Sequence, residues 1–179
     1  MLDAILPYPL HPAVVHLPIA LTLLVPLFAI GALVAIRRGA KPLRAWAIPS
    51  ALLAALAISA WVSVETGESA DEQVERVVAE APIESHEEAA EAFLALSVGV
   101  FGVALVGLVH GRVGQIARWA GAAGTVALVV TGWNVGHTGG ALVYRHGAAS
   151  AYATTAAATT AAATSAWGER PAPHEDGER

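Results

Sequence analysis

The chain has 179 residues, of which 55% are hydrophobic and only 14% charged, and its formal net charge is −5. Soluble domains carry roughly a quarter charged residues, so this deficit indicates that much of the chain contacts lipid. The absence of cysteine excludes disulfides, thiolate metal sites, cysteine-ligated iron–sulfur clusters and c-type haem attachment. The negative charge argues against nucleic acid as a partner.

Four apolar segments follow one another along the chain, at about residues 14–36, 45–64, 92–109 and 116–135. Each is close to the roughly 20 residues that cross a bilayer as a helix. We therefore predict an all-α, integral membrane four-helix bundle formed by residues 1–147. Pro18 and Pro26 are expected to kink the first helix, and Arg118 in the fourth is expected to snorkel toward the interface.

The basic residues predict how these helices are oriented. Six of the ten lie in the loops that join the first helix to the second and the third to the fourth: Arg37, Arg38, Lys41, Arg44, Arg112 and Arg118. The loop at residues 65–91 instead has ten acidic residues and only Arg76. The positive-inside rule places the basic loops in the cytoplasm. We therefore predict a multi-pass protein of the bacterial inner membrane, with both termini and the acidic loop on the periplasmic side.

The acidic loop contains a helical pattern of its own. Val74, Val77, Val78 and Ala81 recur at three- and four-residue spacing, which predicts a short amphipathic helix on the membrane surface that ends at Pro82. The acidic residues form either a solvated face or a docking surface for a cationic partner, such as a soluble electron carrier.

The chain beyond the fourth helix differs in composition from the bundle. Residues 148–168 are mostly alanine and threonine and lack the leucine, isoleucine and phenylalanine of a membrane span. They are expected to form a linker or a surface helix. Residues 169–179 are rich in proline and charge, which predicts a disordered tail.

Five of the seven histidines lie near the predicted outer ends of the helices: His11, His16, His86, His137 and His146. His110 lies at the other end of the third helix, about 36 Å from His86 at 1.5 Å per residue. Ionisable residues at the mouth of a membrane bundle are candidates for function. Imidazole is a common metal ligand, and haem iron takes one axial ligand from each face. The five histidines therefore predict b-type haem or a metal, while helix capping is the alternative for each one singly.

Other features near that end have two interpretations each. Gly132, Gly136 and Gly140 are four residues apart and could face a helix or a porphyrin. Glu65 could either end the second helix or accept a hydrogen bond from a ligand histidine. The sequence contains no nucleophile elbow and no phosphate-binding loop, so a stand-alone enzyme is not expected.

The segment at residues 11–21, HPAVVHLPIAL, resembles the opening motif of a bacterial family of four-helix membrane proteins of unknown function. The resemblance continues with Thr66-Gly67, and the segment at 139–147, GGALVYRHG, is similar to the closing motif. The resemblance covers about residues 4–147 and implies a four-helix membrane fold. Some relatives are fused to Rieske-type domains, which implies work near electron transfer. The matching histidines are His11, His16, His86 and His146, whereas His137 does not match.

These observations together predict a membrane cytochrome-like protein that binds b-type haem near the outer leaflet. His16 and His86 are the first candidates for ligands, followed by His146 and His137, with His11 nearby. The protein would pass electrons between a quinone pool, or a respiratory or photosynthetic membrane complex, and an external carrier. Two alternatives stay open: a membrane protein whose histidines bind copper or zinc, and a structural or accessory subunit of a larger membrane complex.

Overall fold

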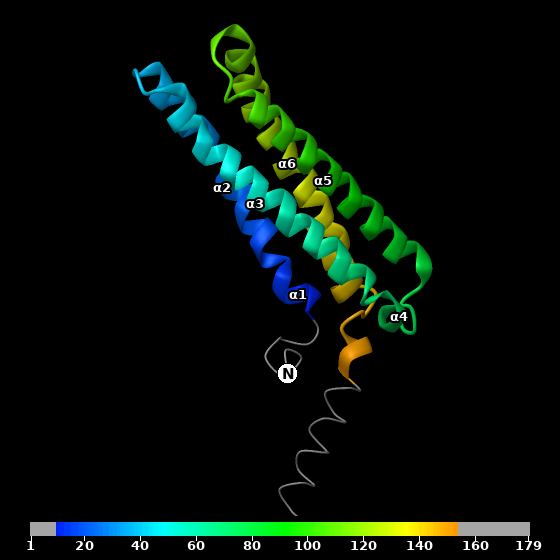
Figure 1. Cartoon of the computed structure of the whole chain (residues 1–179). Coiled ribbons are helices and arrows are strands. Elements are labelled where there is room, and N and C mark those ends of the chain that lie inside the picture. The colour runs from blue at the N-terminus through cyan, green and yellow to red at the C-terminus, as the bar shows by residue number, and fades with distance from the viewer. Residues whose placement is uncertain (1–9, 154–179) are drawn as a thin grey trace, which may run out of the picture.

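The computed structural model describes residues 10–153, and within them every regular element is a helix. In chain order the helices are α1 (His11–Val14), α2 (His16–Arg37), α3 (Pro42–Glu68), α4 (Asp71–Val74), α5 (Glu80–Val106) and α6 (Gly111–Tyr144) (Figure 1). A further helical turn occupies residues 150–153. The predicted disordered tail and the rest of the Ala/Thr-rich extension lie outside the described residues.

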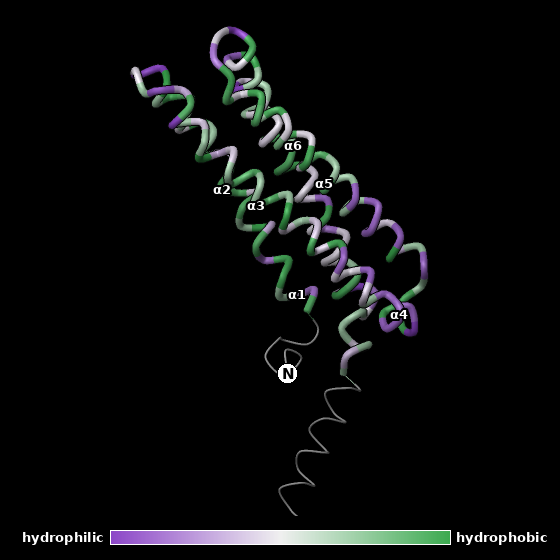
Figure 2. The backbone as a smooth tube through the Cα atoms, viewed as in Figure 1, coloured by the Kyte–Doolittle hydropathy of each residue, from purple (hydrophilic) through white to green (hydrophobic). Residues whose placement is uncertain are grey.

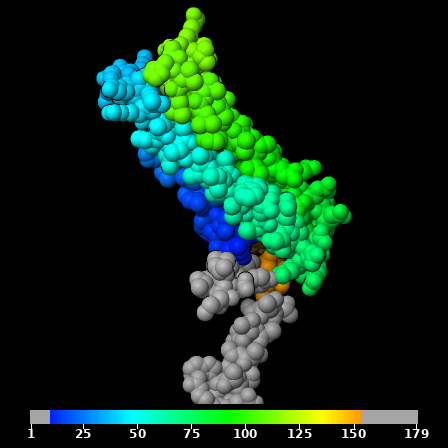
Figure 3. Space-filling view, in the orientation of Figure 1, coloured from blue at the N-terminus to red at the C-terminus, as the bar shows by residue number. Residues whose placement is uncertain are grey.

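The four long helices form an antiparallel bundle (Figure 1). Helix α3 packs against α2 and α5, while α6 packs against α5 and α2. We call the end with the α2–α3 and α5–α6 connections the basic end, and the end with α4 and residues 10 and 153 the acidic end. The space-filling view shows an elongated body in which α3 and α5 lie side by side (Figure 3).

Four helices within residues 10–153 are long and apolar enough to cross a membrane, which confirms the predicted four-helix architecture. Large apolar side chains lie on the outside of the bundle, including Leu23 and Leu27, which are more than 60% exposed. Hydrophilic residues gather around α4 and at the connections of the basic end (Figure 2). This distribution is typical of a bundle whose sides contact lipid.

The interior is built from small and hydroxyl-bearing side chains as well as from leucine and valine. Ser50, Ser63 and Ser97 are buried, and each donates a hydrogen bond to the carbonyl four residues earlier. This pairing satisfies the hydroxyl within its own helix. Small residues at the contacts also let the helix backbones approach closely.

Two helices extend beyond their predicted bounds at the acidic end. Helix α5 begins at Glu80 and not near residue 92, and α6 continues to Tyr144 and not to about 135. The apolar runs predict only the part of each helix that faces lipid, whereas the polar turns beyond it are also helical. As a result, His86 lies inside α5 and His137 inside α6.

The predicted end of a surface helix at Pro82 is wrong. Only Asp71–Val74 form a helix in that loop, and Pro82 lies in the first turn of α5. A proline is tolerated there because the first N–H groups of a helix have no partner within the helix. Val78 and Ile83 are buried together with Leu142 and Ala148, so this connection packs onto the end of α6.

Helix α2 continues through Pro26, so this proline does not end the helix, and the kink expected there stays a prediction. The chain breaks between α1 and α2 at Val15, three residues before Pro18. Proline has no N–H to donate to the carbonyl four residues earlier, so Val14 loses its helical partner at this break. The interruption at Val15 leaves α1 as a short helix of its own at the acidic end.

The prediction that Arg118 snorkels to the interface is also wrong. Arg118 is only 6% exposed, and its Nη1 donates a hydrogen bond of 2.6 Å to the carbonyl of Gly107. The last carbonyls of a helix have no partner within the helix, and Gly107 directly follows α5. Trp46 acts similarly one turn earlier, since its Nε1 donates to the carbonyl of Ala104 at 3.0 Å.

We predict that Trp46→Ala destabilises the bundle by about 2–4 kcal/mol, on the scale of large-to-small core substitutions. Trp46 is fully buried, so its loss leaves a cavity and an unpaired carbonyl on Ala104. Thermal unfolding in detergent micelles measures the change. Trp133→Ala is the control, because Trp133 is 78% exposed. Equal stability losses in the two variants would contradict this account of the basic end.

Candidate functional site

His11 lies in α1 at the acidic end, where its half-buried ring packs against the end of α3. Its Nδ1 lies 2.9 Å from the backbone oxygen of Ser63 and 3.4 Å from the hydroxyl oxygen of Thr66. A carbonyl oxygen can only accept a hydrogen bond, so Nδ1 carries the proton. In the neutral imidazole this leaves the lone pair on Nε2.

His86 lies in α5 and is held in the same way by α6. Its Nδ1 lies 3.0 Å from the hydroxyl oxygen of Thr138. That hydroxyl also lies 3.1 Å from the carbonyls of Asn134 and Val135. The Thr138 hydroxyl can accept from Nδ1 or donate to it, so this contact orients the ring of His86 without fixing its tautomer.

The two rings form a pair that we call the His11–His86 pair. Their centroids lie 6.4 Å apart, and the ring planes are nearly perpendicular, at 85°. The histidines come from α1 and α5, and their hydrogen-bond partners come from α3 and α6. Four elements that are far apart in the sequence therefore meet at this pair.

A glycine lies against each ring. A Cβ atom at Gly67 would lie 3.3 Å from Cε1 of His11, and one at Gly139 would lie 3.0 Å from Cε1 of His86. The contact at Gly139 is tighter than side chains normally make, so an alanine there would displace the ring of His86. These glycines thus hold the two imidazoles in place by close contact.

The surroundings of the pair determine what it can bind. A cavity of about 60 Å³ lies beside His11, between the end of α3, the start of α4 and Tyr152. Within residues 10–153, no group of three or more histidine or carboxylate side chains is close enough to share a metal ion.

The other predicted ligands do not join this pair. His16 on α2, His137 on α6 and His146 just beyond α6 are exposed, and so is Glu65 at the end of α3. Sequence reasoning favoured His16 over His11 because it placed His11 outside the first helix. It also missed Ser63 and Thr138, which orient the two rings. The only sequence signal near them was the presence of Thr66-Gly67 and Gly139 in the two motifs.

An acidic cluster lies next to the pair. Asp71 of α4 makes a side-chain hydrogen bond with Glu87, the residue that follows His86. Burial raises the pKa of Asp71 to about 7, and the hydrogen bond and the negative charges of Glu87, Glu75 and Glu68 act in the same direction. A proton shared between Asp71 and Glu87 therefore holds α4 against α5 near neutral pH.

Comparison with known proteins gave no relative: no protein-family model, no curated protein and no solved structure matches this chain. The resemblance to the four-helix family stays a prediction. Function therefore has to be inferred from the His11–His86 pair itself.

We predict that Asp71→Asn flattens the pH dependence of stability. Folded Asp71 titrates at about 7 and not at its ordinary 3.8, so the folded state keeps a proton that the unfolded chain releases. This contribution to stability is complete below the ordinary pKa and is lost as pH rises to about 7. Unfolding temperatures in detergent between about pH 5 and pH 8 measure the slope.

Above pH 7 the Asp71→Asn variant is expected to be more stable than the wild type, because the repulsion with Glu87 is removed. Glu72→Gln serves as the control, since Glu72 is an exposed neighbour in α4. An unchanged slope in Asp71→Asn would show that the Asp71–Glu87 contact does not govern the stability of this end.

Proposed function

We propose that the chain is a membrane electron-transfer protein that holds b-type haem between His11 and His86. The observation that carries the proposal is the close pairing of two imidazoles, each of which is held at Nδ1 by a hydrogen bond to another helix. The haem would supply one-electron transfer, and the chain would supply its axial ligands and its position in the membrane.

The spacing of the two rings supports this role. Two metal–nitrogen bonds of about 2.0 Å, with ring centroids about 1.1 Å behind each nitrogen, put trans imidazoles about 6 Å apart. The centroids of His11 and His86 lie 6.4 Å apart. Two imidazoles at a tetrahedral angle would lie closer together. The spacing is therefore compatible with one metal ion shared by the two imidazoles.

The hydrogen bonds behind the rings provide a second line of support. A ligating histidine almost always donates its other N–H to a carbonyl, carboxylate or similar acceptor, which fixes the tautomer and the ring orientation. Ser63 supplies this acceptor for His11, and Thr138 can supply it for His86. Both acceptors belong to helices other than those that carry the histidines, so the bundle sets the orientation of the pair.

A porphyrin is larger than the 60 Å³ cavity beside His11. Haem binding therefore requires the acidic end to open, with α1 and the segment after α6 moving outward. Such an opening would break the hydrogen bond of His11 to the Ser63 carbonyl, which the bound haem would have to replace or restore. The two ring-supporting glycines, Gly67 and Gly139, would then face the porphyrin beside its ligands.

We further propose the bacterial inner membrane as the location, with the basic end in the cytoplasm and the acidic end in the periplasm. The haem would then lie near the outer leaflet. A quinone or a larger membrane complex would exchange electrons with it from one side. A soluble carrier with a positive surface would approach over the acidic residues around α4.

We predict that His11→Ala and His86→Ala each lower the haem content of the purified protein by about tenfold or more, since losing a ligand costs at least as much as losing its hydrogen-bond partner. The haem extracted per chain, from cells that make b-type haem, measures the effect. His16→Ala and His137→Ala are the matched controls, because both histidines are exposed near the same end. Loss of haem in the controls but not in His11→Ala would reject this ligand pair.

A pair of glycine variants separates ligand geometry from general packing. Gly139→Ala is expected to lower haem content by roughly tenfold, because its Cβ would displace the ring of His86. Gly136→Ala, one turn earlier on α6, has open space around the added Cβ and should bind normally. Equal binding by both variants would mean that the orientation of His86 does not matter.

The small cavity favours a second candidate, a copper protein in which His11 and His86 bind one Cu(I) ion. Imidazole suits copper, and a linear two-coordinate ion fits the 6.4 Å spacing without any opening of the bundle. Copper and haem are distinguished by elemental analysis of the same preparation. One copper ion per chain without haem would establish this alternative. If the protein contained neither copper nor haem, an accessory subunit of a membrane complex would be the remaining candidate.

A further inference from the structure

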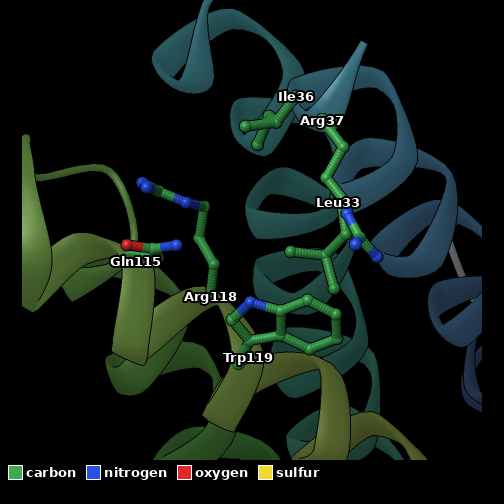
Figure 4. Close-up of a pocket in the computed structure, with 6 residues that line it drawn as sticks. All are labelled: Leu33, Ile36, Arg37, Gln115, Arg118 and Trp119. Carbon is green, nitrogen blue, oxygen red and sulfur yellow. The ribbon is translucent and has the colours of Figure 1, made fainter.

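A second cavity, of about 150 Å³, lies at the opposite, basic end of the bundle. It opens between α2 and α6 and is lined by Leu33, Ile36, Arg37, Gln115, Arg118 and Trp119. In Figure 4, Arg37 and Arg118 extend from the two facing helices, with Leu33 and Trp119 between them. The cavity thus combines two guanidinium groups with an apolar wall.

Arg118 has hydrogen-bonding capacity that the protein does not use. Both of its hydrogen bonds within the described part of the chain come from Nη1, to the carbonyls of Gly107 and Val109. No fully buried side-chain nitrogen in residues 10–153 lacks a partner, so Nε and Nη2 reach accessible space. These N–H groups can therefore donate to an acceptor from outside the protein.

No carboxylate of the neighbouring sequence can neutralise this charge. The chain has no aspartate or glutamate at residues 4–64 or 92–168, whereas all six basic residues of the two connecting segments lie at this end. Arg37 is exposed at the rim of the cavity. The positive charge around the cavity therefore calls for an anion from another molecule.

The apolar residues around the cavity indicate what kind of anion would bind there. Val113 and Ile116 on α6 are 63% and 60% exposed on the same part of the helix as the cavity, and Trp119 is half exposed. Tryptophan and arginine together are typical of the depth at which lipid headgroups meet the acyl chains. Basic pockets between membrane helices on the cytoplasmic side bind anionic headgroups.

We propose that this cavity binds the headgroup of an anionic phospholipid. The phosphate would accept hydrogen bonds from the exposed guanidinium of Arg37, and Gln115 would bind the polar part of the headgroup. Arg118, whose guanidinium points away from that of Arg37 in Figure 4, would add positive charge, and an acyl chain would lie along the exposed apolar face of α6. The proposal requires that the helices span a membrane, but it does not depend on haem or copper at the acidic end. A haem-free protein with this lipid site would separate the two proposals.

Native mass spectrometry of the full chain in detergent micelles tests the site, with phosphatidylglycerol or phosphatidylcholine of the same acyl chains added at equal concentration. We expect the wild type to retain one phosphatidylglycerol in preference to phosphatidylcholine. Arg37→Gln should lower this retention by about fivefold, the effect of one arginine near a membrane surface. Arg37 is the residue to change, because a variant of Arg118 would also release the carbonyls at the end of α5.

Arg38→Gln is the matched control, since Arg38 is the exposed next residue and does not line the cavity. It should retain phosphatidylglycerol like the wild type, whereas Gln115→Ala should retain less. Equal retention of the two lipids, or equal losses in Arg37→Gln and Arg38→Gln, would overturn the proposal. Displacement by glycerol phosphate at the same concentration would also overturn it, because the ligand would then be a soluble phosphate ester.

Discussion

The structure depends on one constraint: a carbonyl left unpaired at the end of a helix in an apolar environment needs a donor from within the protein. At the basic end Trp46 and Arg118 donate to the carbonyls of Ala104 and Gly107, where α5 ends. At the acidic end His11 donates to the carbonyl of Ser63, which lies inside α3 and also accepts the Thr66 hydroxyl, so this contact adds a donor from α1 to a carbonyl that is already paired. Each of these donors links its own helix to another helix or, for Arg118, to the residue that follows α5. Pairing the carbonyls therefore also holds the helices of the bundle together.

The same constraint gives the histidines their chemical character. Because the carbonyl of Ser63 can only accept, it fixes the proton of His11 on Nδ1. Thr138 orients the ring of His86 through the contact between its hydroxyl and Nδ1. A hydrogen bond that is needed for packing thus leaves a nitrogen lone pair on the ring of His11. The 6.4 Å spacing of the rings then supports a shared ligand between them.

The two ends of the bundle differ in charge, and this difference separates their proposed roles. The basic end has arginines without nearby carboxylates and a cavity with an apolar wall, which supports an anionic lipid as its partner. The acidic end combines the histidine pair with a carboxylate cluster around Asp71. A cofactor there would lie under a negative surface that attracts cationic partners.

The apolar segments predicted the number and order of the membrane-length helices, because each is long enough to span and is bounded by polar residues. They could not predict the polar turns of α5 and α6 at the acidic end, because these turns lack the apolar composition by which a membrane-spanning segment is recognised. His11 shows the consequence: a separate short helix, α1, directs it toward α3, while the more regular position of His16 is exposed. The burial of Arg118 was equally hidden, because the sequence does not show that its guanidinium turns back to the carbonyl of Gly107 at the end of α5.

Electron paramagnetic resonance of the oxidised, haem-loaded wild type tests the central claim most directly. If haem were held by His11 and His86 with their ring planes still at 85°, its low-spin signal would be strongly anisotropic, because nearly perpendicular ligand rings produce such a signal. That signal should disappear in His11→Ala and in His86→Ala. A high-spin iron signal in the wild type, or a copper signal in its place, would contradict a haem held between His11 and His86.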